Sequence, residues 1–351
     1  MIAIDIINPF DFSAEDHIIP LSLALQPEHI QGKLAELLVD HKTYASTLKL
    51  KQISVTRYKP RKRCIVEYTF ECIEDCNSNS DIVIIGKIGL ARQIEQKSFD
   101  LQLGLTQNGF HDDSSDCISV PHPIGVLPEC RMWLQLKYSG STLGNILDRN
   151  IDSNLAKNIA IAAHKIHNVN LPTFRNHFIN DEMRILHDRL ERVIHAAPQW
   201  RNRLIAIYTA AEKLAATLPP ATLCGIHRDF YPDQILVHKE RLYLLDFDLY
   251  SIGDPNLDIG NFIAHVTEYS LRKYADYEYL QEFETTLIET IVALSNKINP
   301  QAIMVYSILT LVRHIYISTL HRTRQKLTPD LLFLCEEKLA VKSKNRVTVL
   351  I

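Results

Sequence analysis

Glycine is scarce in this sequence of 351 residues, which contains only 11 of them. None of the glycines forms the G-x-G-x-x-G pattern of dinucleotide-binding proteins or the G-x-x-x-x-G-K pattern of the P-loop, so the sequence excludes both of those nucleotide sites. The seven cysteines are scattered, and Cys72 and Cys76 have no second pair at the spacing of a zinc site. We therefore expect reduced thiols, as in a cytosolic protein.

Targeting and membrane signals are also missing from the sequence. No Lys or Arg precedes Lys33, so the N-terminus lacks the charged start of a secretory signal. The longest mostly apolar run, Ala302 to Val312, is too short to span a bilayer. The 38 basic and 41 acidic residues give a formal net charge of −3, which argues against a protein that coats nucleic acid or anionic membrane. We expect a cytoplasmic protein with no nucleic-acid or membrane partner.

Alternating strands dominate the first part of the chain. Hydrophobic residues make up 46% of the sequence and charged residues 23%, which is typical of globular proteins, and the length suggests two lobes. Positions 64, 66, 68, 70 and 72 are all apolar or aromatic, the period of a half-buried strand. Further strands are expected at 52–58, 81–88 and 131–138, with helices at 27–39 and 92–105. Residues 1–138 are therefore expected to form a β-rich lobe with a leading helix.

Helical spacing takes over after Gly140, and only residues 222–249 interrupt it with a β hairpin. The predicted helices cover 143–148, 154–169, 181–196, 201–218, 279–297 and 301–319. Residues 139–351 should therefore form a larger, mostly helical lobe, joined to the first through a hinge at 138–140. The predicted fold class is α+β, with two lobes of which the smaller contains an antiparallel sheet.

The residues suited to chemistry lie around the hairpin. Asp229 follows His227 in a His-x-Asp pattern, Gln234 comes five residues later, and Asp246 ends the return strand. Phosphoryl transfer needs a carboxylate that orients the attacking hydroxyl and oxygen ligands that hold Mg²⁺ against the nucleotide phosphates. A single Asp at a strand end is usually a turn former. Four such elements in one order, with a hairpin that brings its two ends together, instead favour a phosphotransferase.

Two segments around this hairpin, 227–237 and 245–265, resemble the aminoglycoside phosphotransferase / choline kinase superfamily. Residues 57–64 and 121–126 are also similar to it, so the resemblance extends over roughly 27–339. It implies a bilobal protein-kinase-like fold and an enzyme that transfers the γ-phosphate of ATP or GTP to a substrate hydroxyl with Mg²⁺. Only eleven residues separate Asp246 from Asp258, too few for the long activation segment of a protein kinase, so a small substrate is favoured.

The resemblance also assigns roles in the larger lobe. Asp229 matches the catalytic base and Asp246 the Mg²⁺-binding aspartate. Gln234 stands where the family usually has Asn, so it keeps the amide oxygen for the metal but adds one methylene. His227 and Asp258 are expected to support the catalytic loop.

In the smaller lobe, the resemblance places Lys87 at the nucleotide phosphates, with Glu95 as its expected partner on the following helix. A glycine-rich phosphate loop is missing, and the turn at 59–63 is basic instead. Lys62 and Arg63 would supply charge to the phosphates, although a solvated basic turn explains them equally well. Two further residues are assigned to the nucleotide site, Leu136 and Tyr138.

The substrate is not identified by these motifs. Residues 265–290 contain six acids, which would suit a cationic substrate or form a solvated helix face, and the tyrosines of 274–279 would stack on a sugar or cation or pack internally. The missing glycine loop and Gln234 also leave a second function open. In that alternative the protein is a catalytically silent, kinase-like nucleotide-binding or scaffold protein.

Overall fold

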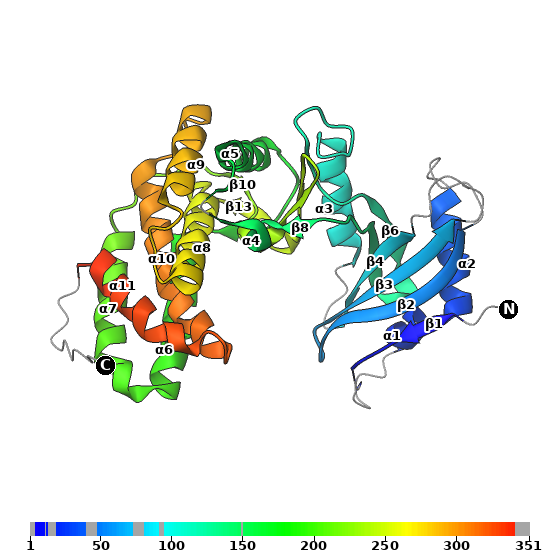
Figure 1. Ribbon diagram of the computed structural model, residues 1–351, viewed down its shortest axis with the longest axis horizontal. Coiled ribbons are helices and arrows are strands. Elements are labelled where there is room, and N and C mark those ends of the chain that lie inside the picture. Colours follow the sequence, from blue (N-terminus) through cyan, green and yellow to red (C-terminus); the bar gives the residue numbers. More distant parts are fainter. Residues whose placement is uncertain are drawn as a thin grey trace. The chain divides into compact units, whose positions relative to one another are not determined.

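The computed structural model describes residues 4–10, 12, 19–39, 48–72, 81–90, 95–148 and 150–340. It divides the chain into two compact units: residues 1–141 with 236–248, and residues 142–235 with 249–351. The hairpin that the sequence placed in the helical lobe thus clusters with the first unit. We call the two parts the sheet unit and the helical unit (Figure 1).

A six-stranded sheet forms the centre of the sheet unit, in the order β1-β2-β3-β4-β7-β6. β1 pairs parallel with β2, and the other neighbours are antiparallel. The core lies where α1 and α2 cover the sheet, and Tyr68, fully buried there, donates a hydrogen bond to the carbonyl of Ala24. The strands are β1 (Asp5–Ile7), β2 (Leu48–Lys59), β3 (Arg63–Cys72), β4 (Ile82–Gly89), β6 (Pro123–Leu127) and β7 (Met132–Leu136), and the helices are α1 (Ile19–Ala24), α2 (Pro27–Val39) and α3 (Glu95–Gln107).

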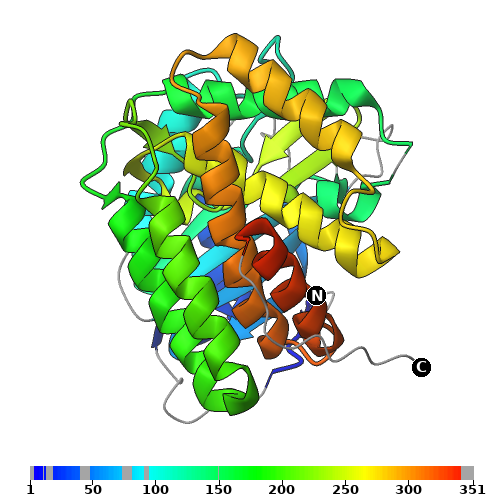
Figure 2. The ribbon, with the colours of Figure 1, turned by 90° about the vertical axis from the view of Figure 1, so that its left-hand side faces the viewer.

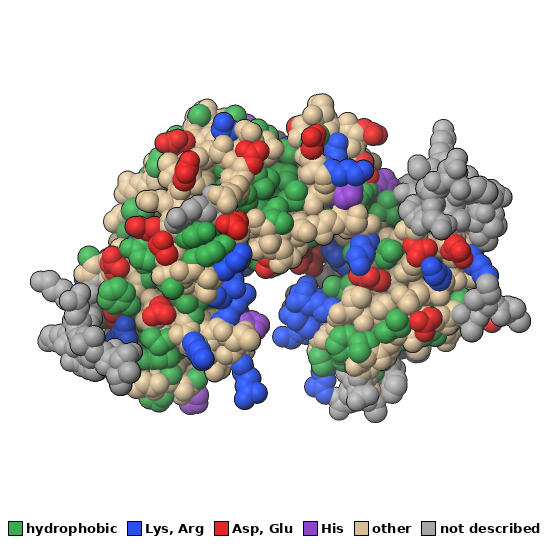
Figure 3. Space-filling model, viewed as in Figure 1, with side chains coloured by type: hydrophobic (Ala, Val, Ile, Leu, Met, Phe, Trp, Pro, Cys, Tyr) green, Lys and Arg blue, Asp and Glu red, His purple; other side chains and the backbone are tan. Residues whose placement is uncertain are grey.

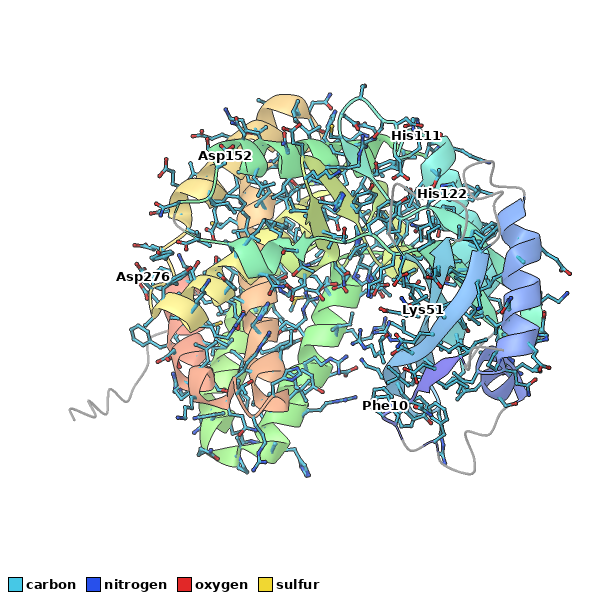
Figure 4. The ribbon with its side chains drawn as sticks, turned by 45° about the vertical axis from the view of Figure 1, so that its right-hand side comes forward. Phe10, Lys51, His111, His122, Asp152 and Asp276 are labelled. Atoms are coloured by element: carbon cyan, nitrogen blue, oxygen red, sulfur yellow. The ribbon has the colours of Figure 1, made fainter. Side chains whose placement is uncertain are left out.

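The predicted hairpin consists of β11 (Ile235–His238) and β12 (Arg241–Leu244), in a four-stranded sheet ordered β5-β12-β11-β8. β12 pairs parallel with β5 (Ile118–Ser119), and β8 spans Ser141–Thr142. The Arg241 guanidinium donates hydrogen bonds to the hydroxyls of Ser114 and Ser119, at 2.9 and 2.7 Å. It also reaches the carbonyl of His111, which Figure 4 labels at the loop after α3. The hairpin is therefore anchored to residues more than 120 positions earlier in the chain.

The helical unit is built around α10 (Pro300–Leu320), which contacts α6, α7, α8 and α11 (Figure 2). A small sheet contains β10 (Cys224–Ile226), β13 (Ser251–Gly253) and β9 (Asn176–His177), and β10 leads into the loop that carries Asp229. The helix α8 was not among the predicted helices, and neither was α11. The other helices are α4 (Leu143–Ile146), α5 (Ser153–Asn168), α6 (Ile179–Ala196), α7 (Arg201–Ala215), α8 (Asn256–Tyr274), α9 (Gln281–Leu294) and α11 (Thr328–Lys338).

The length of α10 corrects the sequence analysis. Its 21 residues are long and apolar enough to cross a membrane, whereas the sequence analysis judged the run 302–312 too short. Of the most apolar window in this helix, 61% is buried inside the fold. A core helix of a soluble protein passes the same test of length and composition, so α10 is weak evidence for a membrane span.

A half-buried carboxyl group lies where α8 and α9 face each other. Glu284 of α9 accepts a hydrogen bond from the hydroxyl of Thr267 at 2.9 Å and lines a cavity of about 330 Å³ in the helical unit. Burial raises the pKa of Glu284 to about 8, against smaller lowering effects of Thr267 and Lys338. The folded protein therefore binds a proton that the unfolded chain releases near pH 4.5.

This carboxyl group predicts a pH-dependent loss of stability. Between pH 4.5 and 8 the unfolded chain binds fewer protons at this position, so the free energy of unfolding falls as the pH rises. Glu284→Gln should remove this dependence and be roughly 1–2 kcal/mol more stable than wild type at pH 8 but little different at pH 5. Urea unfolding from pH 5 to 8 measures it, with the exposed Glu282→Gln on the same helix as control. Identical pH profiles for the two variants would contradict the prediction.

Candidate active site

The loop after β10 is held by one buried carboxylate. Asp258, near the start of α8, accepts hydrogen bonds from the backbone N–H groups of His227 and Arg228 at 2.8 and 2.6 Å. Arg228 has a φ of 72°, a left-handed conformation that is strained for a residue with a side chain. Two charge-assisted hydrogen bonds on consecutive N–H groups hold the chain in this conformation. Asp229 follows directly.

His227 is completely buried, and its ring contacts the loop itself. Its Nδ1 atom lies 3.3 Å from the backbone nitrogen of Asp229, which donates to it, and its ring packs near Phe230. The amide of Asn261, one turn after Asp258 on α8, donates to the carbonyl of Phe230 at 2.9 Å. The backbone on both sides of Asp229 is thus fixed by neighbouring side chains.

His167 was missed as part of this support. It lies at the end of α5, and its Nε2 is 3.0 Å from the Asp258 carboxylate, both side chains being buried. The helical spacing around 154–169 indicates that His167 faces inward, but only the fold brings it to a residue 91 positions later.

Asp229 stands on the wall of a cavity of about 340 Å³ in the helical unit. Tyr231 lines the same cavity and stacks on His265 of α8, with ring centroids 4.5 Å apart. Burial, followed by the neighbouring His314 and then the arginines Arg313, Arg324 and Arg272, lowers the pKa of His265 well below its usual value. The cavity therefore contains a carboxylate at one wall and a neutral, half-buried imidazole at another.

Gln234 and Asp246 are the predicted metal ligands. Gln234 ends a short helical turn, Pro232–Gln234, and its side-chain nitrogen donates to the hydroxyl of Tyr231 at 3.2 Å. The hairpin β11–β12 begins after Gln234 and ends before Asp246, as the sequence predicts. Gln234 belongs to the helical unit and Asp246 to the sheet unit, so their shared metal site stays a prediction.

The sheet unit has its own cavity, of about 320 Å³, lined by basic residues and by three carboxylates, those of Glu95, Asp246 and Asp248. Asp246 has a φ of 58°, and its carboxylate lies 4.0 Å from the Arg63 guanidinium. Burial, and next the charge of Asp246, raises the pKa of Asp248, so the two carboxylates lie close enough to repel each other. Asp248 was not among the predicted site residues, although it forms an Asp-x-Asp pattern with Asp246. The basic lining residues are Arg57, Lys59, Lys62, Arg63 and Lys87.

Lys87 and Glu95 both line this cavity, but they are not ion-paired in the described part of the chain. The Lys87 ammonium lies 4.6 Å from the centre of the Trp133 ring, in a cation–π contact. The Oε2 atom of Glu95 is buried without a hydrogen-bond partner. Lys87 and Glu95 therefore line the same cavity without forming the expected ion pair in this structure. The expected start of the helix near Arg92 lies outside the described residues.

Leu136 and Tyr138, the two remaining nucleotide-site predictions, are not among the residues that line this cavity. Leu136 is buried in the core of the sheet unit. Tyr138 stacks on Tyr243 of β12, with ring centroids 4.0 Å apart, and donates a hydrogen bond to Asp112. Both residues thus contact the core or the hairpin.

Comparisons with known proteins agree with the predicted class. Residues 119–286 match the model of the phosphotransferase enzyme family. A choline kinase from Cryptosporidium parvum is 13% identical with a TM-score of 0.56, and 89% of this chain and 95% of that chain are covered. A choline kinase from Streptococcus pneumoniae is 15% identical with a TM-score of 0.52, and 88% of this chain and 99% of that chain are covered. No curated protein sequence matches the chain.

These findings confirm the resemblance to the aminoglycoside phosphotransferase / choline kinase superfamily. They also confirm the α+β, protein-kinase-like fold, because the structural likeness extends over nearly the whole chain. The family match supports a small-molecule phosphotransferase of the kinase type.

The position of Asp258 predicts that its removal loosens the loop that carries Asp229. Asp258→Ala would leave the N–H groups of His227 and Arg228 and the His167 ring without their acceptor, at a cost of about 3–5 kcal/mol of unfolding free energy. Hydrogen exchange of the amides in 226–230 should accelerate as well. Asp188→Asn, on the exposed face of α6, is the control. Unchanged stability in Asp258→Ala would contradict this role.

Proposed function

We propose that this protein is a cytoplasmic phosphotransferase that moves the γ-phosphate of ATP or GTP to a hydroxyl group of a small molecule, with Mg²⁺. The placement of Asp229 is the observation that carries the proposal. Its backbone is held by a loop fixed at Asp258, and its side chain lines a cavity large enough for a small acceptor. A carboxylate in that position is suited to orient a hydroxyl and to accept its proton.

In this proposal, the basic residues of the sheet unit bind the nucleotide phosphates. Lys62, Arg63 and Lys87 line one cavity, and their cationic side chains replace the backbone N–H groups that a glycine-rich loop would offer. Burial and then the charges of Arg57, Arg63 and Lys62 lower the pKa of Lys59 beside them. Triphosphate oxygens would relieve this mutual repulsion.

The donor atoms present fit Mg²⁺. Asp246 and Asp248 are two carboxylates close enough to repel each other, and no group of three or more His, Cys, Asp or Glu side chains within the described ranges would hold a metal alone. Mg²⁺ in phosphotransferases is held by one or two carboxylates together with substrate phosphates. Asp246, Asp248 and Gln234 would hold the ion, whose charge neutralises the phosphates during transfer.

Replacement of the catalytic base should separate binding from turnover. Asp229→Asn keeps the shape of the side chain but cannot accept the hydroxyl proton, so acceptor-dependent ADP release should fall by about 10²–10⁴-fold. Binding of Mg-ATP should remain at the wild-type level. ADP release with a panel of hydroxylated acceptors, and calorimetry for the nucleotide, measure both effects. A wild-type rate in Asp229→Asn would reject the assignment.

Nucleotide binding tests the sheet unit directly. Titration of Mg-ATP and of Mg-GTP into the wild type should show binding that requires Mg²⁺, and Asp246→Asn should weaken it about tenfold or more. The control is Asp81→Asn, which removes an exposed carboxylate paired with Lys51 on the same unit (Lys51 is labelled in Figure 4). If neither nucleotide binds at millimolar concentration, the alternative of a silent kinase-like scaffold replaces the proposal.

A further inference from the structure

The cavity beside Asp229 is lined by two facing helices. His265, Glu268, Tyr269 and Arg272 lie on successive turns of α8. Arg313 and Ile317 face them from α10, and His321 and Arg324 follow on the turn after it. Three arginines thus line a cavity of about 340 Å³ that also contains the proposed catalytic base.

Three carboxylates line this cavity, those of Asp229, Asp233 and Glu268, and Glu268 is engaged by the protein itself. Glu268 is buried, and Arg272 donates to it at 3.0 Å from the next turn of α8. The carboxylate of Asp233 packs against the backbone of Gly144, where an added Cβ would lie 2.1 Å from its Oδ1 atom. The acidic stretch that the sequence analysis weighed for a cationic substrate therefore gives this cavity one buried glutamate, already paired.

Two of the arginines retain positive charge for a ligand. Arg313 donates to Asn261 and lies 3.4 Å from Glu182, but Glu182 is shared with His177. Arg324 is half-buried and has no ion pair in the described ranges. The charges of these arginines also act on His314, which lies behind the cavity wall. Burial, and then the charges of Arg313, Arg324 and Arg272, lower the pKa of His314 to about 3. Arg313 and Arg324 thus place two cationic side chains on this wall of the cavity.

The aromatic cluster that would accept a substrate cation is already occupied. The Lys273 ammonium lies 5.1 Å from the ring centres of both Tyr269 and Tyr274 and donates to the Tyr269 hydroxyl at 2.6 Å. Tyr274 stacks on Tyr279 with centroids 3.6 Å apart. These tyrosines therefore bind a lysine of the same unit, and an ammonium-bearing acceptor finds no free aromatic cage there.

From this arrangement we infer that the acceptor is an anion: a small hydroxylated molecule with a phosphate or carboxylate group, held by Arg313 and Arg324 while its hydroxyl faces Asp229. The inference rests on the proposed function and names its substrate class. Planar guanidinium groups match both anionic groups with paired hydrogen bonds. Choline, named for two proteins of similar fold, would instead bring a cation next to two arginines.

Arg324 is the residue to test, because Arg313 also holds Asn261 and Glu182 and its loss would disturb the fold. Inorganic phosphate is titrated calorimetrically into the full chain, in the presence of Mg-ADP, to compare wild type, Arg324→Gln and the exposed neighbour Arg322→Gln. We expect phosphate to bind the wild type and Arg322→Gln, and Arg324→Gln to weaken it by about 10- to 100-fold. Circular dichroism checks that each variant is folded.

One further variant and four further ligands show which unit binds phosphate and which anionic group the cavity prefers. Lys62→Gln reports any phosphate held by the sheet unit, and glycerol 3-phosphate, glycerate, glycerol and choline are compared as ligands and as phosphate acceptors. Tighter binding of glycerol 3-phosphate or of glycerate identifies which anionic group is preferred. The inference is overturned if phosphate does not bind, if Arg324→Gln binds it as well as wild type, or if choline is the preferred ligand. Failure of the proposed function is recognised separately, by absent Mg-nucleotide binding.

Discussion

The conformation of the loop that carries Asp229 depends on the carboxylate of Asp258. It is buried, and it accepts two backbone N–H groups from a loop 30 residues earlier in the sequence and contacts His167 from a third segment. A buried carboxylate without such partners would be costly, and the strained φ of Arg228 would relax without the two N–H bonds. The same hydrogen bonds thus compensate both the burial of the Asp258 carboxylate and the strained backbone of Arg228. They also fix the position of Asp229, the next residue.

The two units contain different parts of the proposed site, and each part is built by local packing. In the sheet unit, the hairpin β11–β12 is held to β5 by Arg241, and Asp246 and Asp248 follow that hairpin. In the helical unit, α8 supplies both Asp258, which supports the loop, and the wall of the cavity that Asp229 faces. The same helix therefore positions the proposed base and shapes the space for its substrate.

Local patterns predicted much of this arrangement. The alternation of 64–72 gives β3, and the order of His227, Asp229, Gln234 and Asp246 around a hairpin predicts the class, because these signals depend only on near neighbours in the sequence. His167 and Arg324 could not be found in this way. Each acquires its position from packing between segments far apart in the sequence, and neither has a spacing that distinguishes it from an ordinary surface or packing residue.

The scarcity of glycine bears on how phosphates would be bound. A glycine-rich loop offers backbone N–H groups, whose direction is set by the main chain at little electrostatic cost. The turn at 59–63 offers ammonium and guanidinium groups instead, and the lowered pKa of Lys59, which follows from burial and then from its basic neighbours, shows that they repel one another. Such a site is destabilised when empty and stabilised by a polyanion, so its affinity would depend more steeply on ionic strength than that of a glycine-rich loop.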